Sequence, residues 1–277
     1  MEFWRSQPLT EEPRSPLWRW WRVAAALALV IALGPPAGEA APPPAAGARS
    51  LHYDVSIRGI PLLTLDFRIA ETAADYHVDG FVRTVGVADL LADFVMRSES
   101  RGVITADRLH PSVHESSSRW RHGERGTHLD FAADGTVAAV VSGTPEPESS
   151  VSLPTAQQSA GTVDPLTAVL AINHEITRAG SCDVRMPIFD GRRRYDLVLA
   201  DEGLEGAAVT AEGGVRRCRI DLLKIAGFPS REAARPDHGR AWVQAQGEGE
   251  PALPVRIEFD TKWGPITVRM ARAAPAQ

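Results

Sequence analysis

The feature that most constrains the fold of this chain is an alternation of apolar and polar side chains with a period of two. It is clearest in residues 51–57 (LHYDVSI) and 63–70 (LTLDFRIA). Successive side chains of a β-strand point to opposite faces, so such a segment buries one face and exposes the other to solvent. Further predicted strands are residues 76–85, 98–105, 128–132, 136–141, 184–189, 194–200, 207–210, 215–222, 241–245, 255–260 and 266–270. The sequence therefore predicts a largely antiparallel β protein.

Short glycine-containing turns separate these strands. Asp134-Gly135 and Asp190-Gly191 each stand between two alternating segments, which is the pattern of a tight β-hairpin. A Glu212-Gly213-Gly214 turn and a Trp263-Gly264-Pro265 turn divide the later strands in the same way. Most neighbouring strands are therefore expected to pair with each other along the chain.

Two segments have helical rather than strand-like spacing. Residues 88–96 place Leu90, Leu91, Phe94 and Val95 on one helical face. Residues 165–178 begin after Asp164, a good N-cap, and end before Gly180, a good C-terminal cap. The fold class is thus mainly β (α+β), with one or two short helices packed on the sheet.

The first 40 residues have the features of an export signal. Arg19 and Arg22 precede an uncharged apolar run at residues 23–33, which is shorter than the roughly 20 residues of a membrane span. Small residues at Gly38 and Ala40 suit cleavage before residue 41. We expect a signal peptide at 1–40, a flexible tether at 41–50, one β-rich domain at 51–272 and no permanent membrane span. Cleavage after Ala48 and an uncleaved inner-membrane anchor are the alternatives.

The chain contains only two cysteines, Cys182 and Cys218. In an exported protein an even number of cysteines favours a disulfide. Closing this loop would stabilise the fold by about 3–4 kcal/mol through loss of chain entropy in the unfolded state. Two buried free thiols are the alternative.

The sequence contains no complete catalytic or cofactor motif. It has no G-x-S-x-G segment, no phosphate-binding glycine loop and no dinucleotide-binding fingerprint. The formal net charge of −5 gives no indication of nucleic-acid binding. We therefore predict no catalytic residue and no cofactor, and a non-enzymatic protein is favoured.

Four histidines, His110, His114, His122 and His128, fall in one segment. On a regular strand His110 and His114 would point to the same face. Nothing in their spacing demands a metal, so we expect solvated histidines and no metal site. His174-Glu175 lacks the second histidine of a zinc-protease helix.

Two groups of arginines have two interpretations. Residues 192–194 are all arginine, and Arg216, Arg217 and Arg219 lie close to Cys218. Together they could form a positive patch for lipid headgroups or acidic glycans. The favoured interpretation is a solvated sheet face, balanced by Asp190, Asp196 and Asp221.

The order of several short motifs resembles the bacterial domain-of-unknown-function family 3108, which is found in exported envelope proteins. The motifs are Tyr53-Asp54-Val55 with Gly59, residues 76–86, Ser100-Arg101-Gly102, Leu109-His110-Pro111, Asp164-Pro165-Leu166, Cys182 with Phe189-Asp190-Gly191, and Cys218, Gly227 and Pro254 with residues 258–265 (EFDTKWGP). The resemblance covers residues 51–271. It implies a long curved antiparallel sheet, a β-sandwich or an open β-barrel, with no assigned activity and no catalytic residues to transfer.

These observations predict a periplasmic envelope protein that binds a lipid, another apolar or amphipathic ligand, or an envelope protein partner. Candidate ligand-binding residues are Phe67, Phe81, Leu91, Phe94 and Trp120. Leu63, Leu65 and Leu90 are further candidates for the lining of the same cleft. The same side chains would also suit an ordinary core. The alternatives are an envelope hydrolase or glycan-modifying enzyme that uses residues 110–128, and a structural module that docks through its edge strands.

Overall fold

The computed structural model describes residues 48–106, 108–144, 151–205, 214–229, 237–246, 250–261 and 264–271. The expected signal peptide at 1–40 and most of the tether at 41–50 lie outside these residues. So do the predicted strand at 207–210, most of the Glu212-Gly213-Gly214 turn and part of the Trp263-Gly264-Pro265 turn.

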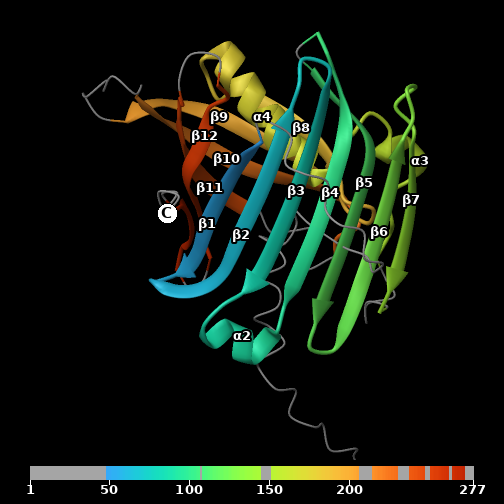
Figure 1. Cartoon of the computed structure of the whole chain (residues 1–277), viewed down its shortest axis with the longest axis horizontal. Helices are drawn as coiled ribbons and strands as arrows, with labels where there is room; N and C mark the ends of the chain where they lie inside the picture. The colour runs from blue at the N-terminus through green and yellow to red at the C-terminus, as the bar shows by residue number, and fades with distance from the viewer. Residues whose placement is uncertain are drawn as a thin grey trace, which may run out of the picture.

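The molecule is built on one antiparallel sheet of 13 strands (Figure 1). The strands are β1 (Arg49–Ile57), β2 (Ile60–Glu71), β3 (Asp75–Thr84), β4 (Val95–Thr105), β5 (Arg108–Trp120), β6 (Gly123–Phe131), β7 (Val137–Gly143), β8 (Val184–Phe189), β9 (Arg194–Glu205), β10 (Val215–Ala226), β11 (Asp237–Gln244), β12 (Leu253–Phe259) and β13 (Ile266–Met270). Their order in the sheet is β7-β6-β5-β4-β3-β2-β1-β13-β12-β11-β10-β9-β8. Strands that are neighbours along the chain pair with each other, except β7 and β8, which form the two edges, and β1 also pairs with the last strand, β13.

The sheet curls around helix α4 (Pro165–Ala179), so the long curved sheet or open barrel implied by the family resemblance is confirmed. In Figure 1 the first strands form the near wall and α4 lies behind them. The helix contacts β3, β4 and β5 on one side and β8 on the other. A single sheet whose edge strands are β7 and β8 excludes the β-sandwich interpretation for the described residues.

The two edges approach each other without pairing as strands. Gly161 N–H donates to Gly135 O beside the β6–β7 turn, and Val163 forms a parallel bridge with Ile188 of β8. The β8–β9 turn completes the closure, because Gly191 sits so close to β6 that a Cβ would lie 2.5 Å from a methyl of Thr127. Gly191 also has a φ of 91°, which favours glycine.

Both ends of α4 are fixed. The Asp164 carboxylate accepts hydrogen bonds from Leu166 N–H and Thr167 N–H, and Gly180 ends the helix in the left-handed conformation, as the sequence predicts. Just after the helix, Cys182 forms the expected disulfide with Cys218 of β10, with the two Cα atoms 5.7 Å apart. Both cysteines are fully buried, so the bridge ties the helix end to the far wall of the sheet.

The predicted first helix is wrong in its extent and in its apolar face. Helix α2 covers only Val87–Ala92, because Asp93 adopts a left-handed conformation and residues from Val95 onward enter β4. No residue of α2 is buried. The chain also forms a short helix α3 (Ala156–Ser159), where Thr155 and Gln158 make a capping box.

Candidate ligand-binding cavity

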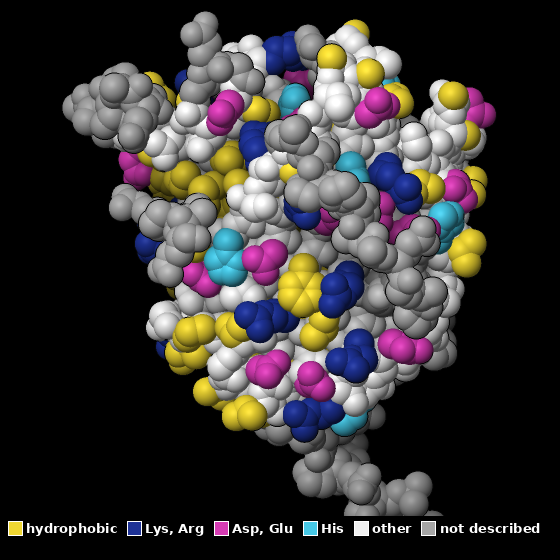
Figure 2. Space-filling model, in the orientation of Figure 1, with side chains coloured by type: hydrophobic (Ala, Val, Ile, Leu, Met, Phe, Trp, Pro, Cys, Tyr) yellow, Lys and Arg dark blue, Asp and Glu magenta, His cyan; other side chains and the backbone are white. Residues whose placement is uncertain are grey.

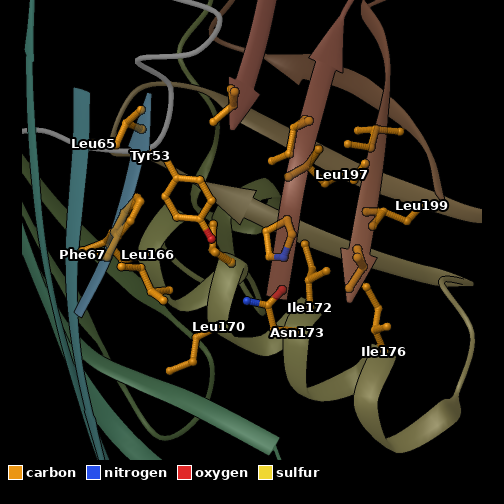
Figure 3. A pocket seen from close by; sticks show the side chains of 18 of the residues that line it. Tyr53, Leu65, Phe67, Leu166, Leu170, Ile172, Asn173, Ile176, Leu197 and Leu199 are labelled. Carbon is orange, nitrogen blue, oxygen red and sulfur yellow. The ribbon is translucent and has the colours of Figure 1, made fainter. Parts of the chain in front are cut away.

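An open cavity of about 200 Å³ lies between α4 and the two walls of the curled sheet (Figure 3). Its lining is almost wholly apolar and comes from strands at both ends of the chain together with the helix. The lining residues are Leu51, Tyr53, Leu65, Phe67, Ile69, Val78, Leu166, Val169, Leu170, Ile172, Asn173, Ile176, Tyr195, Leu197, Leu199, Ile220, Leu222, Ala241, Val243, Pro254, Ile257, Phe259 and Val268. Well-packed cores have few voids larger than a water molecule, so a space of this size is a feature of the fold.

Tyr53 and Asn173 bring polar groups into this apolar space. Figure 3 shows the Tyr53 hydroxyl, from the sheet, and the Asn173 amide, from α4, pointing toward the space between the two walls. Both side chains are buried. Burial raises the pKa of Tyr53 well above its ordinary value, so the phenol stays a neutral hydrogen-bond donor at physiological pH. The pair can therefore bind one uncharged or acceptor group of a ligand.

The structure brings only part of the predicted ligand-binding set to this cavity. Phe67 and Leu65 line it, and Leu63 belongs to the core beside it. Phe94 packs against the same core without lining the cavity. The ring of Phe81 lies under the guanidinium of Arg97, 4.9 Å from its Cζ.

The remaining predicted residues lie elsewhere. Leu90 and Leu91 are exposed on α2. Trp120 ends β5, where the guanidinium of Arg125 lies 5.7 Å from its ring. Leu90 and Leu91 are exposed because α2 turns its apolar side chains toward solvent, which the helical spacing alone does not show.

Sequence reasoning missed the far wall of the cavity. Tyr195, Leu197 and Leu199 of β9 face inward together with Ile220 and Leu222 of β10. The alternation of apolar residues in these strands marks them as one face of a sheet. It does not show that they lie opposite Phe67, because that follows from the curl of the whole sheet.

A second set of residues, the Asp164 cluster, joins Ser100, His114 and Thr167 around a fully buried carboxylate. Ser100 Oγ donates to Asp164 Oδ1 at 2.6 Å and lies 2.7 Å from His114 Nδ1. Thr167 Oγ1 donates to Asp164 Oδ2, and the Tyr76 hydroxyl lies 2.8 Å from Thr167 Oγ1. Since Ser100 gives its only hydroxyl proton to Asp164, His114 Nδ1 is the donor to Ser100.

His114 corrects two expectations. It is buried rather than solvated, and it does not share a face with His110, which is exposed. The pairing of β4 with β5 shifts register between Arg101 and Gly102. This bulge lies between the two histidines, so their side chains point to opposite faces of the sheet.

The Asp164 cluster has the residue types of a catalytic triad without its geometry. In a triad the serine and the carboxylate contact opposite ring nitrogens of the histidine. Here Ser100 Oγ and Asp164 Oδ1 both lie near Nδ1, at 2.7 and 3.2 Å. Burial by itself raises the pKa of Asp164, but the nearby His114 and the hydrogen bonds from Ser100 and Thr167 outweigh it, and the pKa is lowered. The cluster therefore holds an ionised helix cap inside the sheet.

Among the described residues, His77, Asp79 and Glu99 form a group with the residue types of a metal site. His77 Nε2 lies 3.4 Å from Asp79 Oδ1 and 3.1 Å from Glu99 Oε1. Hydrogen bonds to Asp79 and Glu99 raise the pKa of His77 to about 9. A histidine must be neutral to bind a metal, so this group favours a proton at neutral pH. Arg101 Nε also contacts Glu99 Oε1 at 3.0 Å.

The arginines near Cys218 are balanced by carboxylates. Arg216 pairs with Asp201, Arg217 with Glu202 and Arg219 with Asp221. In the other arginine group, Arg194 pairs with Asp196, and Asp190 accepts hydrogen bonds from the backbone of residues 192 and 193. These contacts favour the solvated-face interpretation over a free positive patch. None of the helices that the structure describes has the length and hydropathy of a membrane span.

Comparisons with known proteins place the chain in a family. No curated protein matches it. One similar solved structure is a beta-barrel-like protein of the domain of unknown function DUF1849 from Brucella abortus, with 11% sequence identity and a TM-score of 0.48 over 80% of this chain and 95% of that one. The family model described as "Protein of unknown function (DUF3108)" matches residues 52–271, and the chain therefore belongs to this family.

Proposed function

We propose that this protein is an exported protein of the bacterial cell envelope that binds the acyl chain of a lipid in the cavity between α4 and the sheet. The observation that carries the proposal is the open cavity of about 200 Å³ with its apolar lining. An engineered apolar cavity of roughly 150 Å³ is large enough to take up benzene. The space suits a segment of an alkyl chain, and the rest of the ligand would extend through the opening.

The half-buried lining residues support an occupant that enters from solvent. Leu51, Phe67, Leu197, Leu222 and Phe259 line the cavity and are only partly buried. Covering these side chains with an acyl chain would remove apolar surface from water, worth about 25 cal/mol per Å². The Tyr53 and Asn173 polar groups give the site a means to orient an ester or carboxyl group.

Export is supported by the leader sequence and by the disulfide. Residues 19–40 have the charge, the apolar run and the small residues of a cleavable signal. The Cys182–Cys218 bridge suits an oxidising compartment such as the periplasm. The intact mass of the protein secreted by its host would test this: a chain that begins at Ala41 is expected, and one that retains residues 1–40 contradicts cleavage.

Native mass spectrometry of the protein, purified without detergent, tests the binding proposal. We expect an adduct with the mass of a fatty acid or phospholipid. Leu197→Trp places a larger ring in the cavity and should abolish the adduct, whereas Val198→Trp, at the neighbouring position whose side chain points to the opposite face of β9, should keep it. Circular dichroism confirms that both variants fold. Adducts that survive Leu197→Trp, or no adduct even after incubation with excess palmitate, would refute the proposal.

A further inference from the structure

Three connections at one end of the sheet form a surface that we call the apolar tip. It comprises the β1–β2 turn with Ile60, helix α2 with Val87, Leu90 and Leu91, and the β5–β6 turn with Arg121. Figure 1 shows α2 and the β1–β2 turn at the same end, and Figure 2 shows hydrophobic side chains there, with acidic and basic side chains among them. The exposed fractions are 54% for Ile60, 63% for Val87, 72% for Leu90 and 51% for Leu91.

The tip is held in place by polar contacts, which leaves its apolar side chains free. Thr84 Oγ1 donates to Asp89 Oδ1 at 2.7 Å, and Arg121 donates to the carbonyl oxygens of Leu90 and Ala92. Val85 N–H donates to Leu62 O, which ties the segment just before α2 to β2. No residue of α2 is buried. A short helix that is anchored in this way and turns its large apolar residues outward is not explained by packing within the chain.

Arginines surround the tip without carboxylate partners. Arg58 lies in the β1–β2 turn, and Arg83 and Arg119 flank Val95 at the same level of the sheet. All three are exposed, and none forms an ion pair with a carboxylate in the part of the chain that the structure describes. By contrast, Arg216, Arg217, Arg219, Arg240 and Arg256 on the opposite wall are each paired.

Fewer carboxylates than arginines lie near the tip, and one of these carboxylates already accepts a hydrogen bond within the chain. Asp89 accepts the hydrogen bond from Thr84, and Asp93 and Glu124 are exposed. Arg58, Arg83, Arg119 and Arg121 therefore outnumber the acids at this end of a chain whose formal net charge is −5. Such an asymmetry orients a protein toward an anionic surface.

We propose that the apolar tip docks on the surface of an anionic phospholipid bilayer. Val87, Leu90 and Leu91 would enter the boundary between headgroups and acyl chains, and the unpaired arginines would contact lipid phosphates. The charge asymmetry favours this occupant over an uncharged protein surface. The inference uses none of the cavity residues, so it stands independently of acyl-chain binding.

A site-specific fluorescent label tests the docking in the full chain. Leu91→Cys carries an environment-sensitive fluorophore on the tip, and Val140→Cys, also exposed and apolar, carries it on edge strand β7. With phosphatidylcholine vesicles that contain phosphatidylglycerol, we expect a blue shift at position 91 and none at position 140. The readout is local, so membrane binding by residues 23–33 cannot produce it. No shift at 91, equal shifts at both positions, or an equal shift on pure phosphatidylcholine would overturn the proposal.

Charge reversal tests the role of the arginines. Arg58→Glu with Arg119→Glu should weaken vesicle binding by at least about five-fold for each arginine, because losing one basic residue near an anionic membrane costs about 1 kcal/mol and the added carboxylate is also repelled. Arg108→Glu, an exposed arginine at the other end of β5, is the matched control and should leave binding unchanged. An equal loss in the control would overturn the proposal. Palmitate affinity in solution should be the same in every tip variant, which separates this test from that of the cavity.

Discussion

Asp164 joins α4 to the sheet, because one buried carboxylate caps α4 through two backbone N–H groups and also accepts hydrogen bonds from Ser100 and Thr167. The N-cap could be predicted from the residues before Pro165. Its partners Ser100 and His114 could not, because they lie on β4 and β5 and meet Asp164 only in the folded sheet.

Asp164→Asn keeps a capping side chain and removes the buried charge. We expect the free energy of unfolding to fall by about 2–4 kcal/mol near neutral pH. Because the pKa of Asp164 is lowered in the folded state, its contribution is present above the pKa of the unfolded chain and is lost as the pH falls through the folded pKa. The difference between the proteins in urea denaturation should therefore shrink in acid. Asp93→Asn, at an exposed left-handed position, should change stability by less than about 0.5 kcal/mol, and an equal loss there would contradict the account.

Two neighbouring carboxylates raise the pKa of His77. Hydrogen bonds to Asp79 and Glu99 raise its pKa from 6.5 to about 9. The resulting stabilisation is fully present below 6.5 and is lost as the pH rises through about 9. An NMR titration of the His77 ring should show a midpoint near 9 in the wild type and a clearly lower one in Glu99→Gln. A midpoint that the substitution leaves unchanged would exclude Glu99 as a cause.

At the scale of elements, local signals predict hairpins and α4 well and predict β5 and α2 poorly. The Asp190-Gly191 turn lies between β8 and β9 as expected, since the turn residues and the alternation agree there. The bulge that separates His110 from His114 arises from pairing with β4, so the sequence of β5 alone does not reveal it. In α2, the left-handed Asp93 ends the helix before its apolar stripe can form.

The disulfide joins the end of α4 to β10, within an apolar cluster that includes Ile176 and Ile220. Cys182 follows α4 and Cys218 lies in β10, 36 positions apart in the sequence. Replacing both by alanine should lower the free energy of unfolding by about 3–4 kcal/mol on the chain-entropy model. Denaturation with and without a reductant measures this effect: the reductant should destabilise the wild type and leave the double variant unchanged. A reductant effect of equal size in both would contradict the assignment.

At the scale of the whole molecule, the curl of the sheet creates the cavity. Phe67 and Leu197 lie far apart in the sequence, and they line one space because the sheet wraps around α4 and its edges meet near Gly191. The alternation predicts which residues face inward. It does not predict how strongly the sheet curves, so it could give neither the far wall nor the opening.

Two glycines test the closure of the sheet. Gly191 and Gly59 both have positive φ, but a Cβ at Gly191 would collide with Thr127 whereas one at Gly59 would meet nothing within 4 Å. Alanine at either position incurs the backbone strain, so the difference between the two variants isolates the contact. We expect Gly191→Ala to be less stable than Gly59→Ala by about 1–3 kcal/mol in thermal denaturation. Equal losses would mean that the β8–β9 turn does not pack on β6.

The affinity of the protein for a series of straight-chain fatty acids, from hexanoate to palmitate, tests the central claim most directly. Isothermal titration calorimetry should show affinity rising about four-fold with each added methylene, because each buried methylene contributes about 0.8 kcal/mol. The rise should level off once the cavity is full, and Leu197→Trp should make it level off at a shorter chain. Affinity that does not depend on chain length, or that Leu197→Trp leaves unchanged, would contradict an acyl-chain site between α4 and the sheet.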